Sequence, residues 1–155
     1  MKTFHFTTES AEETELLGIR LGEKLRAGDV VALSGDLGAG KTRFTFGIAR
    51  ALQVNDYITS PTFTIVNEYL DARLPLFHFD AYRLGDASEL YEIGFDEYLD
   101  RQGILVIEWA DLVKDALPVD TVYVEIQRRD DISPTRRSIT VSVEKEEERF
   151  ADFGN

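Results

Sequence analysis

The chain has no cysteine among its 155 residues. That absence excludes disulfide bridges, thiolate nucleophiles, cysteine-based zinc sites and thiol redox chemistry together. Histidine is almost as scarce, with two residues in the whole chain. A metal centre built from imidazoles is therefore not expected.

Basic residues are also in deficit. The chain has 17 Lys and Arg against 29 Asp and Glu, which gives a formal net charge of −12. A protein that holds a nucleic-acid backbone on its own surface needs clustered positive charge. We therefore expect no binding to DNA, and we expect any RNA to be held by partner proteins. Acidity of this kind also serves plain solubility.

Long hydrophobic runs are missing as well. The longest apolar run near the middle of the chain, Ile104–Ile107, is far too short to cross a bilayer. The polar, mixed segment Met1–Ser10 does not have the form of a targeting signal. We expect a cytoplasmic protein without membrane contact. The length and the 43% hydrophobic content favour one domain over residues 1–155, with the charged segment 144–155 frayed.

Hydrophobic periodicity predicts alternating helices and strands. A capping box at Ser10–Glu13 opens a helix that is expected to reach Arg26. Strands are expected at Val30–Leu33, Phe63–Tyr69, Leu74–Phe79, Ile104–Ile107, Val119–Ile126 and Ser138–Val143, and further helices at Gly40–Leu52, Ala87–Tyr91 and Phe95–Leu99. The last two strands alternate strictly between apolar and polar residues, which favours an antiparallel pair. This order predicts a three-layer α/β domain with a mixed, mainly parallel sheet.

The strongest motif lies between the strand at Val30–Leu33 and the helix that follows it. Gly35-Asp36-Leu37-Gly38-Ala39-Gly40-Lys41-Thr42 matches the phosphate-loop pattern G-x-x-x-x-G-K-[ST] at every specified position. Its glycines let the backbone amides turn toward phosphate oxygens at a helix N-terminus. We expect nucleotide binding by Asp36, Leu37, Gly38, Ala39 and Gly40. Lys41 should reach the outer phosphates and assist catalysis, and Thr42 should ligate Mg²⁺. The fold expected is therefore a P-loop NTPase-like domain with a C-terminal antiparallel strand pair.

Two acids stand at the ends of apolar runs. Glu108 follows Ile104–Ile107, and Asp80 follows Leu76–Phe79. A P-loop ATPase needs an acid at the end of a neighbouring buried strand to hold Mg²⁺, directly or through water. We assign Glu108 to the metal and Asp80 to orienting or deprotonating the attacking water. The opposite assignment stays open.

Four neighbouring features carry weaker signals. Trp109 follows Glu108 directly, and it serves either core packing or nucleotide sensing. The segment Thr59–Thr64 occupies the place of a hydroxyl-bearing switch loop, although an ordinary turn is the simpler interpretation. Arg83 contacts either phosphate or a surface acid. His78 is interpreted as a packed or hydrogen-bonded residue and not as a ligand.

Taken together, these segments resemble the TsaE family (older name YjeE), the small bacterial P-loop ATPase of tRNA threonylcarbamoyladenosine biosynthesis. The resemblance covers nearly the whole chain. The segments that carry it are Thr14–Gly18, the phosphate loop, Ser60–Phe63, His78–Arg83, Glu89–Leu90 with Gly94, and Val106–Ala110. The region after Asp111 matches only loosely.

The resemblance implies that the chain binds ATP with Mg²⁺ and hydrolyses it weakly alone. It implies association with the TsaD–TsaB pair, which transfers a threonylcarbamoyl group to adenosine in tRNA anticodon loops. ATP hydrolysis is then expected to reset that machinery between turnovers, and tRNA is reached only through the partners. Thr14, Thr62 and Trp109 join Lys41, Thr42, Asp80 and Glu108 as the residues that match the family's nucleotide site.

Two other function classes share a phosphate loop. A small-molecule or nucleoside kinase needs an acceptor pocket and an arginine-bearing lid. The only Arg-rich stretch here is Arg128–Arg137, between two strands, and no helical lid insertion is visible. The other class is a non-catalytic binding module in which ATP only orders the segment Thr59–Thr64.

Overall fold

The computed structural model describes residues 1–36, 38–61, 63–144 and 147–154. Leu37 and Thr62, both expected at the nucleotide site, lie outside the described residues. The elements, in chain order, are β1 (Lys2–Thr8), α1 (Ala11–Gly22), β2 (Val30–Gly35), α2 (Lys41–Ala51), β3 (Val66–Tyr69), β4 (Leu76–Asp80), α3 (Ala87–Glu92), α4 (Phe95–Leu99), β5 (Ile104–Glu108), the 3-10 helix η1 (Ala110–Ala116), β6 (Val122–Arg128), β7 (Arg137–Val143) and the 3-10 helix η2 (Glu147–Phe150). In this part of the chain, no helix combines the length and the apolar character needed to cross a bilayer.

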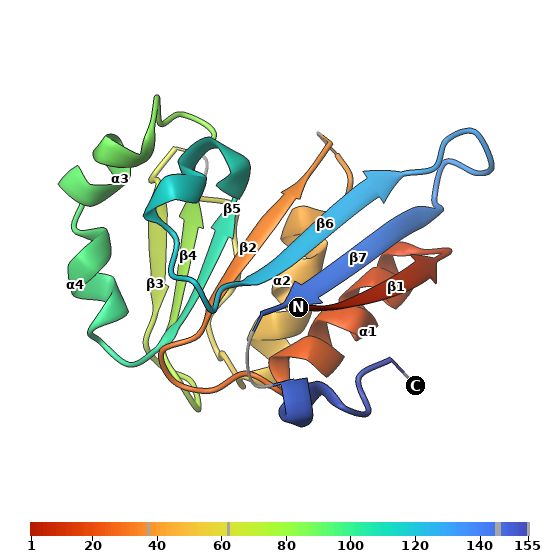
Figure 1. Cartoon of the computed structure of the whole chain (residues 1–155), viewed down its shortest axis with the longest axis horizontal. Helices are drawn as coiled ribbons and strands as arrows, with labels where there is room; N and C mark the ends of the chain where they lie inside the picture. The colour runs from red at the N-terminus through yellow and green to blue at the C-terminus, as the bar shows by residue number, and fades with distance from the viewer. Residues whose placement is uncertain (37, 62, 145–146, 155) are drawn as a thin grey trace.

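The described strands form one mixed sheet in the order β1-β7-β6-β2-β5-β4-β3 (Figure 1). The central strands β6, β2, β5 and β4 run parallel to one another. Antiparallel pairing occurs toward both edges, between β3 and β4 and between β7 and each of its neighbours. The predicted sheet type and the C-terminal antiparallel strand pair are therefore confirmed.

Helices cover the central sheet on both faces, because alternate side chains of each buried strand point in opposite directions. On β2, Val31 and Leu33 belong to the apolar cluster that includes α1 and α2. Val30 and Ala32 belong to the other cluster, which includes residues of α3, α4 and η1. Figure 1 shows α1 and α2 behind the sheet. The predicted three-layer α/β arrangement is confirmed.

Helices α1 and α2 pack closely because glycines lie at their contact. A Cβ atom on Gly18 would lie 2.3 Å from the carbonyl oxygen of Phe44, and one on Gly47 would lie 2.1 Å from that of Glu15. Glu15 also forms an ion pair with Arg50. This packing holds the first turn of α1 beside the N-terminus of α2, where the phosphate loop ends.

The N-terminal segment forms an edge strand that the sequence analysis did not predict. Strand β1 pairs with β7 over its whole length, from Lys2 opposite Val143 to Thr8 opposite Arg137. Phe4 is buried against the core, so the segment interpreted as polar and mixed has an apolar face. The following helix begins as predicted, with the Ser10 hydroxyl accepting the Glu13 amide, but it ends at Gly22 and not at Arg26.

The C-terminal segment corrects the expectation of a frayed tail at 144–155. In its described part, Phe150 and Phe153 are fully buried, and Phe153 meets the ring of Phe4 edge-to-face at 5.3 Å. The Arg149 guanidinium forms an ion pair with Asp29 at 2.7 Å. Two phenylalanines in an otherwise charged segment are enough to close the end of the apolar cluster, which holds these residues against the sheet.

Strand β3 is shorter than predicted and begins at Val66 instead of Phe63. Ile65 has a φ of 71°, a left-handed conformation that β-branched residues rarely adopt. Its backbone is tied on both sides, since its amide donates to the Pro61 carbonyl and its carbonyl accepts the Asp80 amide. The segment before β3 is thereby joined to the last residue of β4.

Candidate phosphate-binding site

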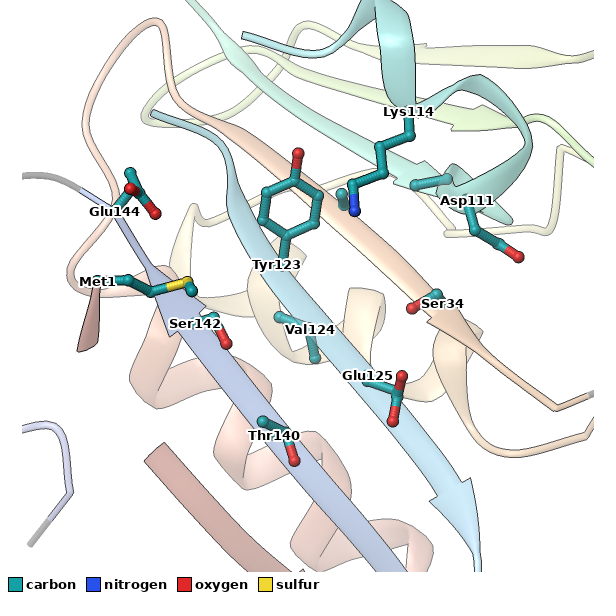
Figure 2. A pocket seen from close by; sticks show the side chains of 12 residues that line it. Met1, Ser34, Asp111, Lys114, Tyr123, Val124, Glu125, Thr140, Ser142 and Glu144 are labelled. Carbon is teal, nitrogen blue, oxygen red and sulfur yellow. The ribbon is translucent and has the colours of Figure 1, made fainter. Parts of the chain in front are cut away.

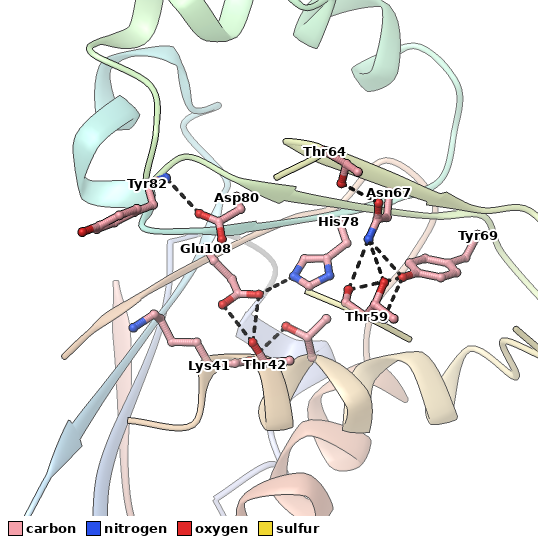
Figure 3. Close-up of polar contacts among 11 residues, drawn as sticks. Lys41, Thr42, Thr59, Thr64, Asn67, Tyr69, His78, Asp80, Tyr82 and Glu108 are labelled. Atoms are coloured by element: carbon pink, nitrogen blue, oxygen red, sulfur yellow. Dashed lines mark hydrogen bonds and ion pairs between the residues drawn. The ribbon is translucent and has the colours of Figure 1, made fainter. Parts of the chain in front are cut away.

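The three chemistry-bearing segments meet at one edge of the sheet. The phosphate loop follows β2, Glu108 is the last residue of β5, and Asp80 is the last residue of β4 (Figure 3). The parallel register places Asp80 opposite Glu108, and Glu108 opposite Leu33. Because the carboxyl ends of parallel strands share one edge, both carboxylates and the loop reach the same place.

The phosphate loop requires glycine where it leaves β2. Gly35 has a φ of 139°, and a Cβ atom there would lie 2.0 Å from the carbonyl oxygen of Ile126. At the far end, Gly40 has a φ of 109° and begins α2 without a side-chain cap. The first amides of α2 therefore remain available at the positive end of the helix dipole, which suits an anion.

The Lys41 side chain is buried at the centre of the site. Its amino group donates hydrogen bonds to the carbonyl oxygens of Gly35 at 2.9 Å and Asp36 at 2.8 Å. It also lies 4.1 Å from the ring centre of Trp109, a cation–π contact. Burial lowers the pKa of the Lys41 amino group, and nearby carboxylates, Glu108 foremost, partly oppose that shift.

Glu108 connects the helix to the neighbouring strand. The residue is 3% exposed, and its Oε1 lies 3.3 Å from the Thr42 hydroxyl, which donates to it. Its Oε2 lies 2.5 Å from Nε2 of His78 on β4. His78 is fully buried and hydrogen-bonded, which confirms its interpretation as a packed residue.

Asp80 is the second buried carboxylate of the site, at 3% exposed. Its Oδ1 accepts the backbone amide of Tyr82 at 2.9 Å. The Tyr82 ring in turn lies 5.0 Å from the ring of Trp109, the residue after Glu108. The structure therefore places Thr42 in contact with Glu108, and Asp80 on the next strand at the same level.

These groups surround a cavity of about 300 Å³. Its lining consists of the second half of the phosphate loop, the first two residues of α2, both acids and two further side chains: Gly38, Ala39, Gly40, Lys41, Thr42, Ser60, Asp80, Glu108 and Trp109. Ser60 brings the Thr59–Thr64 segment to the cavity. Asp36, expected here as well, lines an adjoining hollow with Trp109.

Thr14 and Arg137 flank the loop on its other side. Thr14, predicted at the nucleotide site, shares a cavity of about 100 Å³ with Ala39, Gly40 and Arg137. The Arg137 guanidinium donates to the carbonyl oxygen of Ala39 at 2.9 Å. The sequence indicated only an Arg-rich stretch there, so the role of Arg137 in holding the loop was missed.

The segment before β3 is anchored by a small polar network. The Asn67 side-chain amide donates to the carbonyl oxygen of Thr59 at 3.2 Å and accepts the Thr64 hydroxyl at 2.7 Å (Figure 3). Arg83, considered for phosphate contact, is exposed and lies 5.1 Å from the ring centre of Phe63. It is not among the residues that line the 300 Å³ cavity.

A larger hollow of about 540 Å³ lies on the uncovered face of β6 and β7 (Figure 2). Tyr123, Glu125, Thr140 and Ser142 stand on this face, and Lys114 reaches over Tyr123 from η1. No described residue of the phosphate loop after β2 lines it. Of the two, the smaller cavity is the candidate site, because a buried cation, a hydroxyl and two buried carboxylates converge on it among the described residues.

Comparison with known proteins identifies relatives over most of the chain. The family described as "Threonylcarbamoyl adenosine biosynthesis protein TsaE" matches residues 8–139. A "tRNA threonylcarbamoyladenosine biosynthesis protein TsaE" of Bacillus subtilis is 44% identical over 131 residues, which cover 84% of this chain and 82% of that protein. The protein with the same description from Treponema pallidum is 40% identical over 135 residues, which cover 87% of this chain and 97% of that protein. The crystal structure of Bacillus subtilis YdiB matches with a TM-score of 0.83 and 34% identity, over 98% of this chain and 94% of that one.

Proposed function

The chain belongs to the TsaE family of tRNA threonylcarbamoyladenosine biosynthesis, and on that premise we propose that it is a Mg²⁺-dependent ATPase of that pathway. It binds Mg-ATP at the phosphate loop, hydrolyses it weakly alone, and supports threonylcarbamoyl transfer to adenosine in tRNA anticodon loops. The observation that carries this proposal is the convergence of Lys41, Thr42, Asp80 and Glu108 on one cavity.

The donor set fits Mg²⁺. This ion prefers oxygen ligands and is commonly held by one or two protein groups together with substrate phosphates. Thr42 and Glu108 supply a hydroxyl and a carboxylate in mutual contact. The described residues contain no cluster of three or more His, Asp or Glu that could hold a metal ion alone. In this proposal, oxygen atoms of the ATP phosphates therefore supply the remaining Mg²⁺ ligands. When bound, Mg²⁺ would neutralise part of the negative charge of the ATP phosphates.

The remaining groups have distinct tasks in this proposal. Lys41 leaves the loop carbonyls and reaches the outer phosphates, whose other oxygens meet the first amides of α2. Asp80 orients or deprotonates the attacking water. The small cavity between Thr14 and Arg137 adjoins Gly40, and in this proposal these two residues would hold the nucleoside end of ATP.

Partner proteins carry the RNA in this proposal. With a net charge of −12, the chain is poorly suited to hold tRNA by its own surface. Homologues of TsaD and TsaB bind the tRNA and transfer the threonylcarbamoyl group, in the cytoplasm, and this chain acts on them through its nucleotide cycle.

The test is Mg-ATP hydrolysis by the purified protein, alone and with the TsaD–TsaB pair. We expect slow turnover alone, stimulation by the pair, and support of repeated rounds of tRNA modification. An ATP hydrolysis rate that does not change when the TsaD–TsaB pair is added would contradict the partner-coupled function. Phosphate transfer to an added nucleoside or other small acceptor would favour a kinase instead.

Nucleotide binding should change the fluorescence of the chain's single tryptophan. The Lys41 amino group now lies 4.1 Å from the Trp109 ring centre, and its move to a phosphate removes that charge from the indole. We expect a saturable change in Trp109 emission on titration with Mg-ATP. Titration with adenosine, which has no phosphate, is the matched control and should leave emission unchanged. An emission change of equal size with adenosine would contradict this account.

A further inference from the structure

His78 is a polar side chain in the middle of an apolar strand. Its neighbours Phe77 and Phe79 are fully buried on the opposite face, and His78 itself has no exposed surface. It stands on the α2 face of β4, together with Leu76 and Asp80. Burial of an imidazole is unfavourable unless its nitrogen atoms find partners, so its presence there calls for a reason.

Within the described part of the chain, the His78 ring makes one hydrogen bond, and that bond is to Glu108. Nε2 lies 2.5 Å from Oε2 of Glu108, whereas Nδ1 is buried without a hydrogen-bond partner among the described residues. A leucine would fill such a position without an unsatisfied nitrogen atom. The polar part of His78 therefore serves Glu108 and not the packing of the strand.

The bond to His78 also determines what the Glu108 carboxylate can do. Because Oε2 accepts the imidazole N–H, the carboxylate is held with Oε1 toward the Thr42 hydroxyl, 3.3 Å away (Figure 3). A carboxylate on a flexible side chain would otherwise adopt several rotamers. Outer partners of this kind fix the orientation of ligands around a metal.

We propose that His78 is a positioning residue that holds Glu108 in the orientation in which Glu108 and Thr42 bind Mg²⁺ together. This proposal rests on the proposed function, because it concerns the same metal-nucleotide site. It assigns His78 no contact with nucleotide or metal. Its effect is transmitted through the Glu108 carboxylate alone.

The first experiment examines the hydrogen bond in the nucleotide-free protein. The chain has two histidines, so the ¹⁵N-labelled His5→Gln variant has His78 as its sole imidazole. We expect long-range ¹H–¹⁵N spectra to show the Nε2–H tautomer of His78, with ring shifts that change in the additional variant Glu108→Gln. An Nδ1–H tautomer would overturn the geometry of the proposal. Ring chemical shifts of His78 that stay the same in the Glu108→Gln variant would do so as well.

The second experiment compares three substitutions of His78. The Gln side-chain nitrogen reaches the position of Nε2, the Asn nitrogen reaches only that of Nδ1, and Leu has no donor. For His78→Leu and His78→Asn we expect the Mg²⁺ concentration for half-maximal ATP hydrolysis to rise about 10- to 100-fold, and Mg-ADP affinity to fall by a similar factor. Metal-free ADP should bind as in the wild type, and His78→Gln should restore most of the Mg²⁺ response.

Each outcome decides the matter. A folded His78→Leu protein with the wild-type Mg²⁺ response would overturn the proposal, as would equal losses with Mg-ADP and metal-free ADP, which indicate a general structural role. If His78→Leu does not fold, the comparison of Asn with Gln decides. If the wild type itself binds nucleotide without regard to Mg²⁺, the proposed function fails, and the tautomer measurement shows separately whether the His78–Glu108 bond exists.

Discussion

Lys41→Ala is expected to weaken Mg-ATP binding by about tenfold or more without unfolding the protein. The amino group supplies the buried positive charge of the site, and each charge-assisted hydrogen bond to phosphate contributes about 1.5–3 kcal/mol. Loss of one or two such bonds costs about 1.5–6 kcal/mol and weakens binding roughly 10- to 20 000-fold, since each 1.4 kcal/mol is about a factor of ten. Isothermal titration calorimetry with Mg-ATP measures this directly.

The same substitution should leave thermal stability unchanged or slightly raised at a pH below the lowered pKa of Lys41. The pKa of Lys41 is lowered by burial, so its charged form is less favourable in the folded chain than in the unfolded one. At a pH below both pKa values the charge therefore destabilises the fold, and its removal relieves that cost. The matched control is Lys114→Ala, which removes an exposed charge that does not line the 300 Å³ cavity and should leave ATP affinity intact. Tight ATP binding by Lys41→Ala would count against the whole phosphate-loop interpretation.

Much of the central fold could be predicted because its signals are local. The buried strand β5 is an unbroken apolar run, and β2 leads directly into a motif that dictates a turn and a helix. Strand β1 was missed because its apolar face is reduced to alternate residues among polar ones. Its partner β7 lies at the other end of the chain, and the buried tail depends on the same distant contact through Phe4 and Phe153. Such pairings carry no nearby sequence signal.

In the candidate site, too, the residues with a local sequence signal were predicted, whereas a contact between separate strands was not. Lys41 and Thr42 belong to one contiguous motif, and the two acids were found because each ends an apolar run. The bond between His78 and Glu108 was not predicted, because it depends on β4 lying next to β5. A histidine between two buried phenylalanines was a signal that could have indicated it. The catalytic and metal roles assigned to these residues, and the part of Thr62, remain predictions.

Asp80→Asn is expected to remove hydrolysis while preserving Mg-ATP binding. The asparagine oxygen can still accept the Tyr82 amide, so the local fold is kept, but the carboxylate that orients or deprotonates water is gone. Loss of a positioned general base lowers the rate typically about 10²- to 10⁴-fold. Steady-state phosphate release gives kcat, and the Trp109 emission change gives ATP affinity on the same sample. Asp115→Asn, which neutralises an exposed acid on η1, is the control and should behave as the wild type.

The pattern of this variant also separates the competing interpretations of the site. If Asp80→Asn binds and hydrolyses ATP normally, Asp80 has no catalytic role. If it loses hydrolysis yet supports repeated tRNA modification with TsaD and TsaB, the chain acts as a nucleotide-gated module and hydrolysis is incidental. If high Mg²⁺ restores its hydrolysis, the metal belongs to Asp80 and the water to Glu108.

The geometry favours the assignment of the metal to Glu108 and of the water to Asp80. The Thr42 hydroxyl contacts Glu108, whereas Asp80 on the next strand accepts the Tyr82 amide. Only loss of both hydrolysis and repeated modification, with ATP binding intact, supports the partner-coupled ATPase in full.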